Sequence, residues 1–326
     1  MFTALVVAKV DNGTSVELRR LIDDDLMEGD VTVDVAYSSV NYKDGLATLP
    51  DAGVARISPL IPGIDFAGTV ASSGDPRFPA GTEVIGGGAA VGVSHHGGFA
   101  QRARVPGDYL VPMPAGLDTR SAMAAGTAGM TAAMAVSRLD TLGARPDQGP
   151  LLVTGASGGV GSWAVALAAR KGYEVHASTG KPDRRRHLLD LGATSVIDRL
   201  QPSARTLVSR RWASVIDAVG GSTLAAALTA IDRGGVAVAT GNTGGMALMT
   251  SVAPFILRGA TLTGIDSAAA GPKQRTIAWD HVAAAPRLDD IIEEITLDRV
   301  PAALRRILAG IVAGRLVVAV GDGNTR

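Results

Sequence analysis

The chain of 326 residues contains no cysteine, which excludes disulfide bonds, thiol nucleophiles and thiolate metal ligands. It also has no excess charge, since 31 Lys and Arg balance 31 Asp and Glu. A balanced chain has no overall field that would attract nucleic acid or an anionic membrane. No apolar run is long enough to cross a bilayer, and residues 1–10 lack the pattern of a signal peptide. We therefore expect a cytoplasmic protein that acts on a small molecule, without a nucleic-acid or membrane partner.

Hydrophobic residues make up 46% of the chain and charged residues 19%, enough apolar material for two domains with separate cores. The first 120 residues are β-rich. Phe2–Val10 and Val16–Leu21 predict a hairpin around the turn Asp11–Gly13, and Asp30–Ser38 alternates with a period of two. Because strands and helices do not alternate here, this segment predicts a compact barrel-like domain rather than half of a nucleotide-binding domain.

Strands and helices begin to alternate near Ser121, which predicts a doubly wound parallel sheet of the Rossmann type. The six expected strands are Leu151–Thr154, Tyr173–Ser178, Ser195–Ile197, Ser214–Asp217, Val236–Thr240 and Thr261–Asp266. The last strand-like stretch, Arg315–Val320, is expected to return to the first domain. The predicted division is a catalytic domain of residues 1–120 and 267–326, and a nucleotide-binding domain of residues 121–266.

A glycine-rich turn at Val153–Gly161 joins the first of these strands to its helix. Glycines let the backbone approach a ligand closely, and the free N–H groups at the start of a helix attract an anion. We therefore expect the loop Ser157, Gly158, Gly159 and Val160 to hold the diphosphate of a dinucleotide. The glycine spacing departs from G-x-G-x-x-G, so a tight turn without a ligand is the alternative.

The residues after the second strand indicate which dinucleotide binds. An acidic residue there would accept the ribose hydroxyls of NAD and repel an extra phosphate. The only nearby carboxylate, Asp183, follows a proline and is expected to cap a helix. Thr179 and Lys181 are instead suited to a 2′-phosphate, and Arg199 is expected to reach the same phosphate or lie over the adenine. The cofactor is therefore predicted to be NADPH, whereas at least two of Arg184–Arg186 are expected to belong to a solvated helix face.

The glycine loop is similar to that of short-chain dehydrogenases, which place it at the N-terminus and use a Tyr-x-x-x-Lys pair. Neither feature is present: the residues four positions after Tyr37, Tyr42, Tyr109 and Tyr173 are Asn41, Leu46, Met113 and Ala177. A β-rich front, a central nucleotide-binding domain and a returning tail resemble instead the medium-chain dehydrogenase/reductase family, whose front domain is GroES-like.

The zinc alcohol dehydrogenases of that family require a catalytic cysteine, a Pro-Gly-His-Glu segment and a lobe with four cysteines. The corresponding segment here is Pro62-Gly63-Ile64-Asp65, so no zinc site is expected on that plan. His95 and His96 are adjacent, and neighbouring side chains in a loop do not by themselves supply the ligands that such an ion requires. We expect no metal.

The chain resembles more closely the zinc-free, quinone-oxidoreductase-like branch, and within it the NADPH-dependent acrylyl-CoA reductases. The matching segments are Glu28–Val33, Ser39–Asp44, Ile61–Val70, Asp75–Phe78, Gly97–Gly98, Gly126–Gly129, the glycine loop, Pro254–Arg258 and Gly264–Ser267. The resemblance implies cofactor contacts from Tyr42, Ser157, Gly158, Gly159, Val160, Thr179, Gly180, Lys181, Arg199, Asn242, Ile256 and Ser267. The chain departs from the family at Lys181, where an arginine is frequent, at Asn242, where a leucine is common, and at Ala309-Gly310, where asparagines can occur.

The resemblance further implies reduction of the C=C bond of a short 2-enoyl-CoA, acryloyl-CoA to propanoyl-CoA, by a homodimer. Tyr42 is the expected donor to the thioester oxygen, with Asn41 orienting the substrate, although Tyr42 can equally be a packing residue against the nicotinamide. The dimer is expected to form through the edge strand Thr261–Asp266. An NADPH:quinone oxidoreductase and a non-catalytic NADPH-binding protein are the alternatives.

Overall fold

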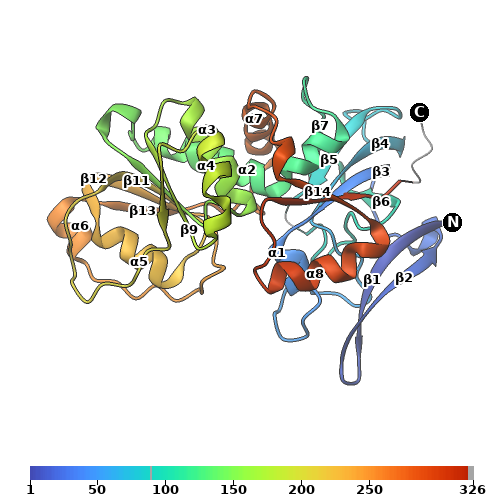
Figure 1. Ribbon diagram of the computed structural model, residues 1–326. Helices are drawn as coiled ribbons and strands as arrows, with labels where there is room; N and C mark the ends of the chain where they lie inside the picture. Colours follow the sequence, from blue (N-terminus) through green and yellow to red (C-terminus); the bar gives the residue numbers. More distant parts are fainter. Residues whose placement is uncertain (89, 322–326) are drawn as a thin grey trace. The chain divides into compact units, whose positions relative to one another are not determined.

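The computed structural model describes residues 1–88 and 90–321, and no helix within these ranges is long and apolar enough to span a membrane. The chain divides into two compact units (Figure 1): unit 1 holds Met1–Thr127 and the segment from Ser267 onwards, and unit 2 holds Ala128–Asp266. Helix α2 (Thr119–Thr141) runs across the first boundary between these units. This helix is broken at Gly126, which has a φ of 53°.

Unit 1 is built on a seven-stranded sheet whose strands β14-β15-β3-β4-β5-β7 lie in that order, with β6 paired to β3. The strands of unit 1 are β1 (Phe2–Val10), β2 (Gly13–Leu21), β3 (Val31–Val40), β4 (Asp65–Ser73), β5 (Glu83–Gly87), β6 (Arg102–Val105), β7 (Leu110–Pro112), β14 (Ile292–Thr296) and β15 (Arg315–Ala319). The predicted hairpin is confirmed, since β1 and β2 pair from Phe2–Leu21 to Val10–Gly13. The predicted return of the C-terminal strand is also confirmed, since β15 runs antiparallel to β3.

Besides the start of α2, the helices of unit 1 are α1 (Tyr42–Leu46), α7 (Pro272–Ala283) and α8 (Val300–Leu308) in the described part of the chain. The segment after β3 is the short helix α1. Gly45 of α1 lies so close to α8 that a Cβ atom there would be 2.8 Å from Leu308 Cγ. The glycine thus allows the two helices to pack closely. The core beneath them includes Val33, Phe66 and Leu316, all essentially buried.

Unit 2 is a six-stranded sheet with the order β10-β9-β8-β11-β12-β13, and every pair in it is parallel. Its strands are β8 (Leu151–Thr154), β9 (Val175–Thr179), β10 (Ser195–Asp198), β11 (Trp212–Asp217), β12 (Ile231–Ala239) and β13 (Thr261–Gly264). The connecting helices are α3 (Gly159–Arg170), α4 (Arg185–Asp190), α5 (Gly221–Thr229) and α6 (Ala253–Arg258). The predicted doubly wound fold is therefore confirmed.

The central strands of unit 2 carry continuous apolar runs because helices shield both faces of a parallel sheet. Leu151–Val153 of β8 and Val215–Ile216 of β11 are fully buried. Thr154, Ser178 and Asp217 lie level with one another at the edge where these strands end. This carboxyl edge is where ligands bind in doubly wound folds.

Candidate functional site

The glycine loop has the geometry of an anion cradle. Gly155 follows β8 with a φ of 59°, and Gly158 precedes α3 without any described side chain capping that helix. A Cβ atom at Gly161 would lie 2.2 Å from the carbonyl oxygen of Gly155, so only glycine fits where the helix meets the loop. The first N–H groups of α3 are thus presented at the carboxyl edge, where the helix dipole also favours negative charge.

The end of β9 is tied to this loop by hydroxyl groups. The Oγ atoms of Ser157 and Thr179 are 2.8 Å apart, and Thr179 Oγ1 also accepts a hydrogen bond from the backbone N–H of Lys181 at 3.1 Å. Thr179 is almost fully buried. The structure therefore brings the predicted residues Ser157, Thr179 and Lys181 together.

Positive charge gathers beyond the ends of β9 and β10. A Cβ atom at Gly180 would lie 2.8 Å from Arg199 Nη2, so the guanidinium group lies directly over the backbone of Gly180. Burial lowers the pKa of Lys181, and the nearby cations Arg184 and Arg199 lower it further, against the opposing effect of Asp183. Such a cluster stabilises a bound anion with several charges, such as a phosphate.

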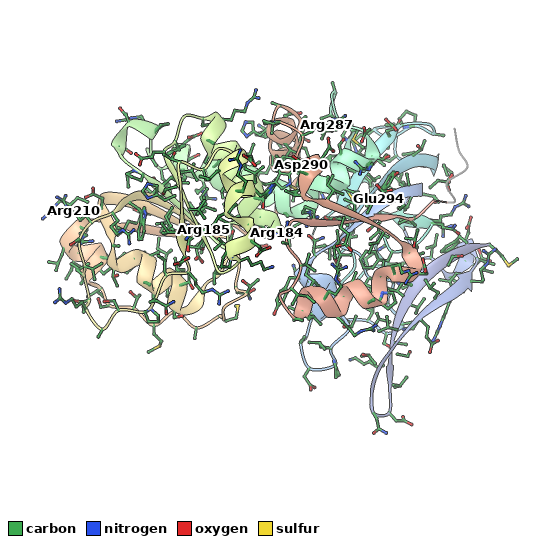
Figure 2. All side chains as sticks on the ribbon, viewed as in Figure 1. Arg184, Arg185, Arg210, Arg287, Asp290 and Glu294 are labelled. Carbon is green, nitrogen blue, oxygen red and sulfur yellow. The ribbon has the colours of Figure 1, made fainter. Side chains whose placement is uncertain are left out.

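The basic run Arg184–Arg186 lies at the start of α4, and its guanidinium groups have carboxylate partners. Arg184, which Figure 2 labels together with Arg185, pairs with Asp183 at 3.2 Å. Arg185 pairs with Asp198 at 2.9 Å, and Arg186 pairs with Asp190 at 3.1 Å. All three guanidinium groups thus have local acidic partners, which supports the interpretation of this run as a solvated face. The predicted capping role of Asp183 is wrong, because Lys181 and Arg184 occupy the cap positions and no side chain caps either helical segment.

Three further predicted cofactor residues lie elsewhere. Asn242 follows the end of β12 at the carboxyl edge, where its Cα atom would be 3.3 Å from a Cβ atom at Gly220. Ser267 lies three residues beyond β13, where the chain passes back to unit 1. Ile256 is on α6, and the neighbouring Arg258 donates hydrogen bonds to the carbonyls of Thr229 and Ile231 at the start of β12. Ile256 lies two residues before this anchored arginine.

Tyr42 is the first residue of α1 in unit 1 and is partly exposed. Among the described residues its phenol has no hydrogen-bond partner. A phenol in this state can donate to a ligand without first breaking a bond within the protein.

Asn41 precedes this helix and is held by buried charged groups. Its Nδ2 donates to Asp65 Oδ2 at 2.7 Å, and its Oδ1 accepts from Arg315 Nη1 at 3.2 Å. Asp65 also accepts hydrogen bonds from Ser39 and Thr127. Both ends of the Asn41 amide are thus occupied, so its predicted action on a substrate carbonyl would require these bonds to break.

Asp44, also on α1, is a fully buried carboxylate. Its oxygens accept backbone N–H bonds from Asn41 at 2.8 Å, Gly63 at 3.1 Å and Ile64 at 2.9 Å. Burial raises its pKa to about 7, and repulsion from Asp65 adds to this effect, although the three N–H bonds favour the anion. From the sequence, Asp44 is interpreted with Lys43 as an ion pair or structural polar contact, or as a source of the proton. Its i+3 position after Asn41 is typical of a capping box.

We expect Asp44 to give a measurable pH dependence of stability. Because its folded pKa of about 7 lies above the ordinary value of 3.8, the folded state holds this proton more tightly than the unfolded state. Its contribution to stability is full below pH ~4 and is lost as the pH rises towards about 7. Urea unfolding of the protein and of Asp44→Asn should show the difference in free energy of unfolding falling across this interval and then levelling. Parallel pH profiles would contradict the assignment.

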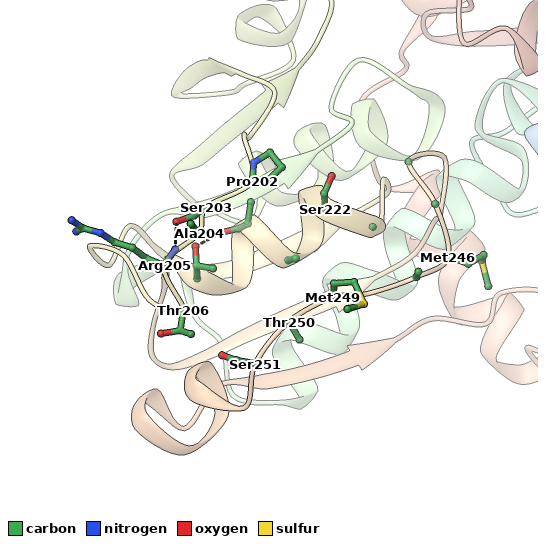
Figure 3. Close-up of a pocket in the computed structure, with 17 residues that line it drawn as sticks. Pro202, Ser203, Ala204, Arg205, Thr206, Ser222, Met246, Met249, Thr250 and Ser251 are labelled. Carbon is green, nitrogen blue, oxygen red and sulfur yellow. Dashed lines mark hydrogen bonds between the residues drawn. The ribbon is translucent and has the colours of Figure 1, made fainter.

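Unit 2 contains a cavity of about 750 Å³. Its lining residues, drawn in Figure 3, belong to α5 and to the segments 202–206, 244–247 and 249–251. None of the glycine-loop residues lines it. The predicted phosphate ligands Thr179, Lys181 and Arg199 do not line it either.

Two family models match the chain: the alcohol dehydrogenase GroES-like domain at residues 27–115 and the zinc-binding dehydrogenase at residues 159–284. An acrylyl-CoA reductase of Ruegeria pomeroyi is 47% identical over 328 aligned positions, which cover 98% of this chain and 99% of that protein. The chain belongs to the acrylyl-CoA reductase family. The resemblance inferred from its sequence is thereby confirmed, together with the GroES-like and Rossmann-type domains.

Two solved structures are also similar to this chain in fold and in sequence. An oxidoreductase of Salmonella enterica in complex with NADP has a TM-score of 0.94 and 45% identity, covering 98% of this chain and 100% of that one. A Bacillus subtilis protein with NAD bound also has a TM-score of 0.94, with 42% identity and coverage of 98% and 99%.

A zinc ion does not fit this member of the acrylyl-CoA reductase family, despite the name of the second family model. In the described ranges no three His, Asp or Glu side chains are grouped as metal ligands require. His95 bonds to the carbonyls of Glu28 and His96, and His96 Nδ1 accepts the N–H of Ile61 at 3.2 Å. Burial lowers the pKa of His96 to about 4. Both rings are therefore held by the backbone.

Proposed function

We propose that this protein reduces the C=C bond of a short 2-enoyl-CoA with NADPH, converting acryloyl-CoA to propanoyl-CoA without a metal. The observation that carries the proposal is the cation cluster of Lys181 and Arg199 beside an uncapped, glycine-lined helix start. Identity of 47% to an acrylyl-CoA reductase over nearly the whole chain supports the choice of substrate.

In this proposal unit 2 binds the cofactor. The N–H groups at the start of α3 would hold the diphosphate, since Gly158, Gly159 and Val160 form that start. Lys181, Arg199 and the hydroxyl of Thr179 would hold the 2′-phosphate, with Ser157 and Gly180 shaping the turn between them. Asn242, Ile256 and Ser267 are proposed contacts that rest on the family resemblance.

When bound, NADPH supplies the hydride that is added to the β-carbon of the enoyl thioester. The residues of unit 1 then have to stabilise the negative charge that develops on the thioester oxygen. We propose that the Tyr42 phenol donates a hydrogen bond to this oxygen, since it has no partner among the described residues. The α-carbon then accepts a proton from water. A donor placed in advance of the reaction stabilises the transition state without reorganisation.

Consumption of NADPH with acryloyl-CoA, crotonyl-CoA and a benzoquinone, measured side by side, tests the proposal. We expect turnover with acryloyl-CoA and appearance of propanoyl-CoA. Turnover of the quinone alone would instead establish a quinone oxidoreductase. Binding of NADPH without any turnover would favour a non-catalytic NADPH-binding protein.

We also propose that the protein is a cytoplasmic homodimer that pairs through β13. This strand is the edge of the six-stranded sheet, and unpaired edges invite a second strand. Exposed apolar side chains lie on the adjoining α6 and the segment before it, namely Met249, Val252, Ile256 and Leu257. A matching patch on a second copy would cover them in a two-fold arrangement.

Light scattering after size exclusion should therefore give the mass of two chains. A charge on the edge strand, Thr263→Lys, should shift the mass toward one chain. A single-chain mass for the unmodified protein would contradict the dimer.

A further inference from the structure

Helix α1 is too short to fix the direction of Tyr42 on its own. It has five residues, from Tyr42 to Leu46, and isolated helices below about 12 residues are unstable in water. Its orientation must therefore come from contacts with the rest of unit 1. Packing of Gly45 against Leu308 supplies one such contact.

Asp44 supplies a second set of contacts. Its Oδ2 atom accepts a hydrogen bond from the backbone N–H of Asn41, the residue directly before Tyr42. Its Oδ1 atom accepts hydrogen bonds from the backbone N–H groups of Gly63 and Ile64. One carboxylate therefore bridges the start of α1 and a neighbouring segment of chain.

That neighbouring segment cannot shift easily. Gly63 has a φ of 99°, and a Cβ atom there would lie 2.6 Å from the backbone nitrogen of Phe99. The carbonyl oxygens of Pro62 and Gly63 accept hydrogen bonds from Phe99 and Gly98 at 3.0 and 2.7 Å. Asp44 thus connects the first turn of α1 by hydrogen bonds to the backbone of Gly63 and Ile64, a segment that is itself held in place.

Burial makes an ionisable group costly at this position. Asp44 is 0% exposed, and the second buried carboxylate Asp65 repels it. The buried guanidinium of Arg315 is the opposing charge, and its side chain bonds to Asn41 and Ser39 rather than to Asp44. Buried carboxyl groups with strongly shifted pKa values are concentrated at functional sites.

We propose that Asp44 is a positioning residue, whose carboxylate fixes the first turn of α1 and so sets the direction of the Tyr42 phenol. The inference rests on the proposed function, in which that phenol donates to the thioester oxygen.

The test is a double-mutant cycle of Asp44→Asn with Tyr42→Phe, using acryloyl-CoA and NADPH. In Asp44→Asn, the side-chain oxygen can still accept hydrogen bonds from Gly63 and Ile64. The amide NH2 group then faces the N–H of Asn41 and cannot accept a hydrogen bond from it. We expect kcat to fall about 10-fold or more, as misplacement of a reacting group does, with KM and the fluorescence-titrated Kd of NADPH within about 3-fold. Because the phenol is then already misdirected, the double variant should be no slower than Tyr42→Phe alone.

Asp75→Asn is the matched control, since Asp75 is another nearly buried carboxylate of unit 1 that accepts a backbone N–H, from Arg77. It is expected to alter the melting temperature without changing kcat. Asp44→Ser replaces Asp44→Asn if the latter does not fold. If the fold decreases in kcat of the two single variants multiply in the double variant, or if Asp44→Asn leaves kcat unchanged, the inference is overturned while the proposed function stands. A wild-type protein that reduces only the benzoquinone would overturn the proposed function itself.

Discussion

Replacing Tyr42 by Phe is expected to lower kcat for acryloyl-CoA on the order of 10²-fold, the usual cost of removing a donor to developing negative charge. The ring is retained, so packing of Tyr42 is largely preserved. Because the donor acts only on the transition state, KM and the Kd of NADPH should change by less than about 3-fold. Steady-state kinetics with direct detection of propanoyl-CoA measures the effect.

Tyr109→Phe is the matched control for this result. Tyr109 lies in the same unit, and its ring packs edge-on against His95 with centroids 5.9 Å apart. The same loss of a phenol oxygen there should leave kcat unchanged. If Tyr42→Phe also retains full kcat, Tyr42 is a packing residue and the donor to the thioester oxygen must be another group.

Replacing Lys181 by Asp is expected to reverse the preference for the phosphorylated cofactor. The change removes a cation from the cluster with Arg199 and places a carboxylate where the 2′-phosphate would lie. Loss of a hydrogen bond to a charged group costs about 1.5–3 kcal/mol, and repulsion adds to it. We expect kcat/KM with NADPH to fall on the order of 10²-fold or more, while kcat/KM with NADH is unchanged or rises.

Arg186→Asp is the control for this substitution, because Arg186 pairs with Asp190 on the solvated face of α4. It makes the same change in net charge at a position five residues away in the sequence. We expect the ratio of NADPH to NADH activity to stay within about 3-fold of that of the unmodified protein, since exposed ion pairs contribute little free energy. Unchanged selectivity in Lys181→Asp would remove Lys181 from the phosphate site.

The sheet of unit 2 was predictable because its strands satisfy local rules. Leu151–Val153 and Val215–Ile216 are short apolar runs, as strands buried on both faces must be. Glycines mark the turns between these strands and the helices that follow. Such features lie within a few residues of one another, so the sequence displays them directly.

The polar interior of unit 1 could not be predicted in the same way. Asp65 and Arg315 are separated by 250 positions in the chain and meet only because β15 returns to β3. Helix α1 spans too few residues to show a helical period. Asp183 was predicted to cap a helix but does not, because its carboxylate forms an ion pair with the adjacent Arg184.

The same interior explains how unit 1 can be ordered without a metal. Gly126 interrupts α2, and a Cβ atom there would lie within 2.7 Å of Arg315, Asp65 and Ser39. The break turns the N–H of Thr127 toward Asp65 at 2.8 Å. Charged side chains, strand ends and a helix break are thus joined in one buried network directly behind Asn41 and Tyr42.

Transfer of the hydride is the central claim, and isotopic labelling tests it most directly. The protein is incubated with acryloyl-CoA and NADPH that carries deuterium at the transferable position of the nicotinamide ring, and the product is analysed by mass spectrometry and NMR. We predict propanoyl-CoA with one deuterium on the β-carbon and none on the α-carbon. Unlabelled product, deuterium at the α-carbon, or no propanoyl-CoA while a quinone is reduced would contradict the account.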